Sequence, residues 1–233
     1  MLRRVLFACL LPFVFLTGCA SLPPGHVADE RDPWERYNRV MFSFNEGVDK
    51  AVLKPVAQTY KANIPEVIRD RVSNFFGNLS DLASVVHHTL QAEPRSALES
   101  TGRFVVNSTV GLLGLFDPAT SIGLSRTNED AGLTLGRWGV GHGPYVMLPL
   151  LGPSSLRDAL GTAADMQMDL TGEILNPDTT QRVALNSLRV VDVRTRLLEL
   201  EKGVDLISFD RYVSVRSAYF GRRERLLEQG EAQ

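Results

Sequence analysis

Apolar residues recur every three or four positions over most of the chain from residue 33 onward, a spacing that places them on one face of an α-helix. The first such run consists of Trp34, Tyr37, Val40, Met41, Phe44 and Val48. Asp32, Pro33 and Glu35 precede it in the order of an N-cap, a first helical position and a capping box. We therefore expect a helix that Asp32 caps.

Prolines and short polar residues divide the rest of the chain into further predicted helices. The helix starts expected in this way are at Pro55, Pro65, Asp81, Pro94, Ser154-Ser155 and Ser208-Phe209-Asp210. In the last third, one apolar stripe has charged residues on its opposite side, and such a stripe usually forms a core face. It consists of Val190, Val193, Leu197, Leu200, Val204 and Ile207, and it is widened by Leu188, Val191 and Leu198. The pattern predicts a mainly α protein.

Two segments depart from this pattern. Residues 104–116 carry no charge and are too short to span a bilayer, so we expect a buried or interfacial helix there. Residues 131–153 contain six glycines and three prolines, with Arg137 and His142 as the only possible charges. So many helix breakers predict a loop or hairpin, with residues 146–151 extended.

The N-terminus has the pattern of a secretory signal. Residues 1–4 are basic, residues 5–16 are almost wholly apolar, and Leu16-Thr17-Gly18-Cys19 fits the bacterial lipobox. We expect cleavage before Cys19, which would then carry a diacylglycerol and an N-acyl chain, and two or three chains hold a protein firmly on a membrane. An ordinary secreted protein with a cysteine at its cleavage point is the alternative. Ala20 favours export to the outer membrane, by analogy with enteric bacteria.

These features divide the chain into four parts. Residues 1–18 are the signal peptide, 19–31 the lipidated cysteine and a flexible tether, 32–225 a helical domain and 226–233 a short C-terminal tail. The domain has no cysteine, since Cys9 and Cys19 both precede it. Disulfides and cysteine-ligated metals are therefore excluded within it.

Composition and motifs restrict the function. The net charge of −2 lacks the basic excess of a nucleic-acid binder. The sequence has no nucleophile elbow, Walker loop, His-Glu-x-x-His helix or Cys-x-x-Cys pair, so we expect no enzyme, cofactor or metal. The adjacent His87 and His88 would point about 100° apart on a helix, which disfavours a shared metal. A lipid hydrolase that uses His142 and Ser154 remains an alternative without a supporting motif.

Several motifs resemble those of the MlaA (VacJ) family of outer-membrane lipoproteins over residues 32–225. They include Asp32-Pro33-Trp34-Glu35, Phe42-Ser43-Phe44-Asn45, Asn74-Phe75-Phe76-Gly77-Asn78-Leu79, Asn107-Ser108-Thr109-Val110-Gly111, Trp138-Gly139-Val140-Gly141, Gly143-Pro144-Tyr145, and Tyr212, Arg216, Tyr219 and Arg222-Arg223. The resemblance implies a ring-shaped bundle of short amphipathic helices with a Gly/Pro-rich hairpin segment. Such a domain would lie at the periplasmic face of the outer membrane of a Gram-negative bacterium, held by its lipid anchor.

The resemblance also implies a function. A central amphipathic channel would remove phospholipids mislocalised to the outer leaflet and pass them to the periplasmic phospholipid carrier of the Mla system. The other implied partner is a trimeric porin, whose identity and docking surface the sequence leaves open, as it does the headgroup preference. This retrograde transport would maintain lipid asymmetry. The alternative is a structural porin-associated lipoprotein that moves no lipid.

Nine residues are expected along the lipid passage. Phe42, Phe44 and Asn45 would form a gate on the first helix, and Arg137 and Tyr145 would lie near headgroups. Gly139, Gly141, Gly143 and Pro144 would let the hairpin segment bend. For the glycines, tight packing or simple turns without gating is an equal alternative.

Overall fold

The computed structural model describes residues 29–207 and 210–231, without the side chains of residues 170–171, 202–207 and 231. The predicted signal peptide, Cys19 and almost all of the tether lie outside the described residues. The first half of the described chain contains α2 (Glu35–Val48), the π-helical turn η2 (Asp49–Leu53), α3 (Lys54–Asn63), α4 (Glu66–Leu90), α5 (Pro94–Thr109) and α6 (Pro118–Ser121). The second half contains α7 (Ala131–Arg137), β1 (Tyr145–Leu148), β2 (Gly152–Ser155), α8 (Leu156–Met168), α9 (Leu170–Leu175), α10 (Thr179–Ile207) and α11 (Arg211–Glu231). The prediction of a mainly α protein is confirmed.

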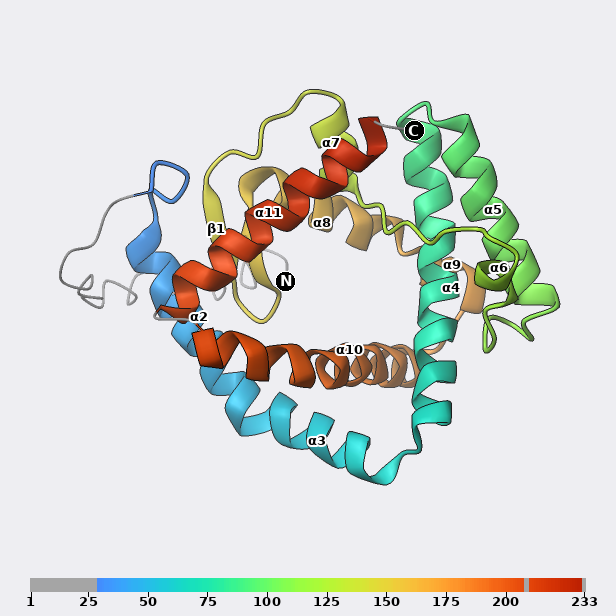
Figure 1. Cartoon of the computed structure of the whole chain (residues 1–233), viewed down its shortest axis with the longest axis horizontal. Coiled ribbons are helices and arrows are strands. Elements are labelled where there is room, and N and C mark those ends of the chain that lie inside the picture. The colour runs from blue at the N-terminus through green and yellow to red at the C-terminus, as the bar shows by residue number, and fades with distance from the viewer. Residues whose placement is uncertain (1–28, 208–209, 232–233) are drawn as a thin grey trace, which may run out of the picture.

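The elements follow one another around a ring-like outline (Figure 1). Helix α4 forms one side, α3 and α10 form the next, and α2, α11 and the β-hairpin complete the circuit toward α7 and α8. No described element crosses the central area of this view. The ribbon thus has the outline that the family resemblance implies.

Helix starts that depend on local backbone chemistry agree with the sequence. Pro65 precedes α4, Pro94 is the first residue of α5, and Pro55 lies at the second position of α3. Ser155 caps α8, because its Oγ accepts a hydrogen bond from the Asp158 amide at 3.2 Å. Residues 208–209 lie outside the described residues, but Asp210 accepts hydrogen bonds from two amides at the start of α11.

Two predicted N-caps are wrong for a common reason. Helix α2 begins at Glu35 with Trp34 at its N-cap, and Asp32 instead accepts a hydrogen bond from Arg216 at 2.6 Å. Asp81 starts no new helix, since α4 continues through it to Leu90. Its carboxylate is buried beside two arginines of other segments, which supply the hydrogen bonds that a helix terminus would otherwise offer.

The segments rich in glycine and leucine were predicted in part. The helix expected over residues 104–116 ends at Thr109, and the loop beyond it holds Leu112 and Leu113 at positive φ. In residues 131–153, the first seven form α7 and residues 145–148 form β1, which pairs with β2 as an antiparallel hairpin. The register of this hairpin places Tyr145 opposite Ser155 and Leu148 opposite Gly152.

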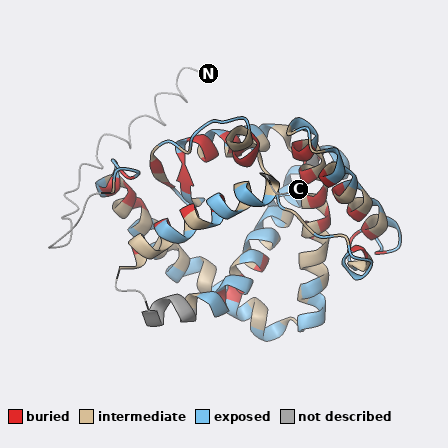
Figure 2. Cartoon of the chain, turned by 45° about the horizontal axis from the view of Figure 1, so that its top comes forward, coloured by how far each residue is buried: buried red, intermediate tan, exposed pale blue. Residues whose placement is uncertain are grey.

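An aromatic cluster holds the hairpin between α2 and α11. Its buried members are Met41, Tyr145, Met147, Tyr212 and Phe220. The Tyr145 ring meets the rings of Tyr212 and Phe220 at centroid distances of 6.2 and 5.7 Å. Figure 2 shows buried residues concentrated around the hairpin, α7, α8 and the adjoining ends of α4 and α5, whereas α3 and α10 are mostly intermediate or exposed.

Candidate functional site

The described part of the chain buries polar side chains and exposes apolar ones. Among the described residues, 21 polar or charged residues are buried, against 10 apolar or aromatic ones. Soluble domains ordinarily show the reverse, because charged side chains are rarely fully buried. Large apolar side chains are exposed on α2, α4, α5, α8 and α10. This exterior suits surroundings that are themselves apolar.

Helix α10 shows the inversion within one element. Asp192 is 2% exposed and accepts a hydrogen bond from Ser73 of α4 at 2.9 Å. Val193 and Leu200 of the apolar stripe are 42% and 66% exposed. The expectation of a core face is therefore wrong for Val190, Val193, Leu197 and Leu200, which are exposed, and right for Leu198, which is buried. The side chains of Val204 and Ile207 lie outside the described residues.

Ion pairs hold the polar residues of α10 against η2 and α3. Arg194 binds Asp49 of η2 at 2.6 Å and Glu201 at 2.6 Å, and Glu201 also binds Lys54 at 3.0 Å. Burial opposes ionisation of Glu201, but the hydrogen bonds and charges of Arg194 and Lys54 outweigh it and lower its pKa to about 2. These pairs fix α10 against α3 with its apolar stripe turned outward.

Two cavities adjoin α10. The one between α3 and α10 has a volume of about 520 Å³ and a mixed lining of charged and apolar groups, among them Lys54, Lys61, Glu199 and Leu198. The other lies where α4, α9 and the start of α10 meet, has a volume of about 490 Å³, and has an almost wholly apolar lining. One helix therefore offers both an amphipathic and an apolar cavity.

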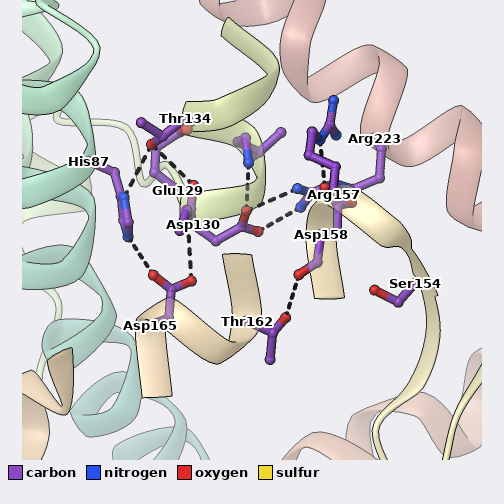
Figure 3. Close-up of polar contacts among 12 residues, drawn as sticks. His87, Glu129, Asp130, Thr134, Ser154, Arg157, Asp158, Thr162, Asp165 and Arg223 are labelled. Atoms are coloured by element: carbon purple, nitrogen blue, oxygen red, sulfur yellow. Dashed lines mark hydrogen bonds and ion pairs between the residues drawn. The ribbon is translucent and has the colours of Figure 1, made fainter. Parts of the chain in front are cut away.

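A second buried charge network joins α7, α8 and α11 (Figure 3). Arg223 binds Asp130 at 2.6 Å and Asp158 at 2.7 Å, and Arg157 binds Asp158 at 2.8 Å. Asp130 also caps α7 through the Leu133 amide at 2.8 Å. Burial opposes the charge on Asp130, but the hydrogen bond and charge of Arg223 prevail, so its pKa lies below the usual value. The network ties the C-terminal helix to the glycine-rich segment.

The adjacent histidines of α4 serve different neighbours. His87 contacts Asp165 at 3.2 Å and Thr134 at 3.1 Å, as Figure 3 shows. His88 contacts Glu93 at 3.0 Å and Thr127 at 2.9 Å. The two imidazoles therefore position α7, α8 and the segment before α7 rather than converge on a common ligand. Within residues 29–207 and 210–231, no cluster of three or more metal-ligating side chains occurs.

The expected gate residues of α2 lie beside the hairpin. Asn45 donates to the Leu148 carbonyl at 2.9 Å and accepts from the Leu150 amide at 2.8 Å. Phe42 meets the Tyr212 ring at 5.8 Å, and Phe44 is exposed. Of these three residues, Asn45 contacts the hairpin turn, and Phe42 packs against α11.

Arg137 and Tyr145 require a correction. Arg137 binds Glu93 at 2.7 Å and Glu129 at 3.0 Å, so its charge is already paired within the protein. Tyr145 is 0% exposed, and burial raises the pKa of its hydroxyl. The expectation that these two side chains meet lipid headgroups is therefore wrong for this conformation, because ion pairing and core packing have taken both of them.

The glycine segment places its members differently. Gly139 and Gly143 have φ of +88° and +66°, a backbone region that favours glycine. Gly141 has no positive φ and open space around it, so this conformation does not require glycine there. Pro144 accepts a hydrogen bond from the first amide of α8 at 2.9 Å. Glycine is thus favoured by the backbone at the two ends of residues 139–143, whereas a side chain could be accommodated at Gly141.

Asn38 and Asp32 are site-forming residues whose roles the sequence did not reveal. Asn38 donates to Asp32 at 2.7 Å and to the Tyr145 carbonyl at 3.1 Å, and it accepts from the Met147 amide at 2.7 Å. Its amide thus occupies the free edge of β1. Asn38 and Asn45 are seven residues apart, or two helical turns, and this spacing was the one sequence feature that could have indicated that both side chains lie on the same face of α2.

The hydrolase alternative gains no geometric support. Ser154 donates to the carbonyl of Ser155, and no hydrogen bond joins it to His142 among the described residues. His142 packs against the Phe220 ring, and burial lowers the pKa of its imidazole.

No helix among the described residues is both long and apolar enough to cross a membrane.

The described helices form a ring-like outline in which charged side chains are buried and large apolar side chains are exposed. Residues 30–226 match the family model for MlaA lipoprotein. The chain belongs to the MlaA lipoprotein family.

Similar proteins cover almost the whole chain. The "Intermembrane phospholipid transport system lipoprotein MlaA" of Escherichia coli (strain K12) is 35% identical, with 97% of this chain and 90% of that protein aligned. The protein of the same description from Haemophilus influenzae is 31% identical over 71% of this chain and 68% of that protein. A solved structure described as "Structural basis for maintenance of bacterial outer membrane lipid asymmetry" aligns with a TM-score of 0.73 and 35% identity, over 84% of this chain and 98% of the other.

Proposed function

We propose that this protein is the outer-membrane lipoprotein of a retrograde phospholipid transport system. It removes phospholipids that have reached the outer leaflet and passes them to a periplasmic carrier. The observation that carries the proposal is helix α10, on which Asp192 is buried while Val190, Val193, Leu197 and Leu200 are exposed, an arrangement that suits a protein surrounded by acyl chains. The transport named for the relatives supports the same assignment.

The passage is an amphipathic route past α10. The cavity between α3 and α10 offers Leu198 to an acyl chain, and Lys54 and Lys61 would bind a phosphate by exchanging their present partners Glu201 and Glu199. Phe42, Phe44 and Asn45 form the gate in this proposal, which is supported by the hydrogen bond of Asn45 to the hairpin turn and the exposure of Phe44. Gly141 provides the unconstrained position at which residues 139–143 could bend.

The protein itself supplies no energy for transport in this proposal. A conduit that binds phospholipid equally from both leaflets cannot shift their distribution, so direction comes from energy-consuming partners. Lipidated Cys19 holds the ring at the periplasmic face of the outer membrane, and a trimeric porin is the partner proposed beside it.

The test measures phospholipid exposed on the cell surface with an acyltransferase that modifies lipid A only when phospholipid is available in the outer leaflet. Deletion of the gene is expected to raise modified lipid A, and the intact gene but not Cys19→Ala is expected to reverse the rise. No rise on deletion would refute the transport function and favour a structural, porin-associated lipoprotein.

A further inference from the structure

The apolar cavity at the junction of α4, α9 and α10 has no occupant within the described chain. Its apolar lining is Phe75, Leu175, Pro177, Ala184, Leu185 and Leu188. Gln181 is the one lining residue with a polar side chain. The volume of about 490 Å³ falls within the range of small-molecule sites. A ligand that fills this cavity must be largely hydrocarbon, because little in the lining can replace lost hydrogen bonds to water.

Helix α10 supplies the longest wall of the cavity. Residues 181, 184, 185 and 188 lie three or four positions apart, so their side chains form one continuous face. Val183 points to a different side of the helix and is 61% exposed. The apolar cavity is therefore a local feature of one face of α10, separate from the general exposure of its apolar residues.

Arg189 follows the lining residue Leu188 in the sequence of α10 and is exposed. Its Nη2 donates to Ser80 Oγ of α4 at 3.5 Å, and no carboxylate of the described residues forms an ion pair with it. Arg194 on the same helix is held by Asp49 and Glu201. Arg182, one residue from Gln181, is paired with Asp169. Arg189 is thus the cation beside the cavity with its charge left for an external anion.

We propose that this cavity binds one acyl chain of a phospholipid and that Arg189 binds the phosphate of the same molecule. A guanidinium recognises phosphate through paired hydrogen bonds, and an adjacent apolar cavity holds the chain that the headgroup carries. The role of this site in transport rests on the function proposed above. It adds a defined lipid-binding position, distinct from the amphipathic cavity between α3 and α10.

The test uses contact quenching of tryptophan by a brominated phosphatidylethanolamine. Both native tryptophans, Trp34 and Trp138, are first replaced by phenylalanine in the full chain. A single tryptophan is then introduced in two separate variants: Leu185→Trp in the cavity wall and Val183→Trp on the other side of α10. Lipid is titrated in detergent. Saturable quenching near one lipid per protein is expected at position 185, with weak, non-saturating quenching at position 183. Equal quenching at both positions would overturn the proposal, since it would mean general contact with lipid.

Charge variants test the phosphate contact in the Leu185→Trp protein. Arg189→Glu is expected to raise the lipid concentration for half-maximal quenching at least tenfold, and Arg189→Lys is expected to raise it less. The control Arg36→Glu, at an exposed position of α2, is expected to leave it unchanged. An unchanged titration with Arg189→Glu would refute the headgroup contact. Brominated stearate is titrated in parallel, and tighter, saturable quenching by this fatty acid would overturn the assignment to phospholipid.

The outcomes separate the two proposals. If the intact gene restores lipid asymmetry but positions 183 and 185 are quenched alike, the cavity assignment fails and the transport function stands. If position 185 is selectively quenched but deletion leaves asymmetry unchanged, the cavity binds lipid and the transport function fails.

Discussion

Gly161 of α8 and Gly132 of α7 meet backbone to backbone, so closely that a Cβ atom on Gly161 would lie 2.3 Å from the Gly132 amide nitrogen. Gly161→Ala is therefore expected to destabilise the protein by about 1–3 kcal/mol through overpacking. Gly221→Ala in α11 is the control, because its nearest neighbour would be an Arg225 nitrogen at 4.0 Å. Urea unfolding in detergent measures both. Equal free energies of unfolding would show that α7 and α8 can separate without cost.

Removal of the Arg223 side chain should expose the dependence of the fold on buried charge. Arg223→Met leaves Asp130 and Asp158 without their shared partner. The expected loss of stability is about 3–5 kcal/mol, as for other broken buried pairs. Arg222→Met, at the exposed neighbouring position, is expected to change stability by less than about 0.5 kcal/mol. Similar melting temperatures for the two variants would contradict the network.

Acid should weaken the α5–α6 connection in a defined range. Burial opposes the charge on Asp117, but hydrogen bonds from Thr120, Asn107 and Arg103 lower its pKa to about 2. A lowered carboxyl pKa stabilises the fold at neutral pH, and this contribution of about 2 kcal/mol is lost as the pH falls from about 4 to 2. Unfolding of wild type and Asp117→Asn should therefore differ at pH 7 and converge at pH 2. A constant difference across this range would contradict the assignment.

The exposed stripe of α10 should govern membrane affinity of the unlipidated chain. In the mature Cys19→Ser protein, Val193→Lys is expected to reduce co-flotation with neutral phospholipid vesicles severalfold, because it places a charge among acyl chains. Asn186→Lys adds the same charge at an exposed polar position of α10. Undiminished flotation of the Val193 variant would show that this stripe lies outside the bilayer.

The Asn45 amide should hold the hairpin turn closed. Asn45→Ala removes its hydrogen bonds with Leu148 and Leu150. Amide hydrogen exchange over residues 148–152 is expected to rise up to about tenfold, the equivalent of one or two lost hydrogen bonds. Ser43→Ala, at an exposed position two residues away, is the control. Unchanged exchange in the Asn45 variant would remove this residue from the proposed gate.

Features that depend on neighbouring backbone could be predicted from sequence. Ser155 and Pro94 start helices because capping and the fixed φ of proline act over one turn. Asp32 and Asp81 have the same local chemistry, but arginines far along the chain bind their carboxylates, and no local pattern reveals that.

The apolar stripe of α10 illustrates a different limit. Periodicity identifies residues that share a face, and it did so correctly for Val190, Val193, Leu197 and Leu200. It does not say whether that face meets a core or a lipid. The buried partners of Asp192 and Arg194 decide the question, and they come from α4 and η2. Arg137 was misplaced for the same reason, since its acidic partners lie outside its own segment.

The contacts of Asp32 determine where a pull on the proposed lipid anchor would act. Asp32 accepts hydrogen bonds from Arg216 and the Tyr212 hydroxyl of α11 and from Asn38 of α2, so the chain that enters from the N-terminus is attached to the first and the last described helix at one point. The ten steps along the chain from Cys19 to Asp29 span at most about 36 Å when fully stretched. A pull on the chain ahead of Asp29 therefore acts on α2 and α11 together, where the two ends of the described domain meet.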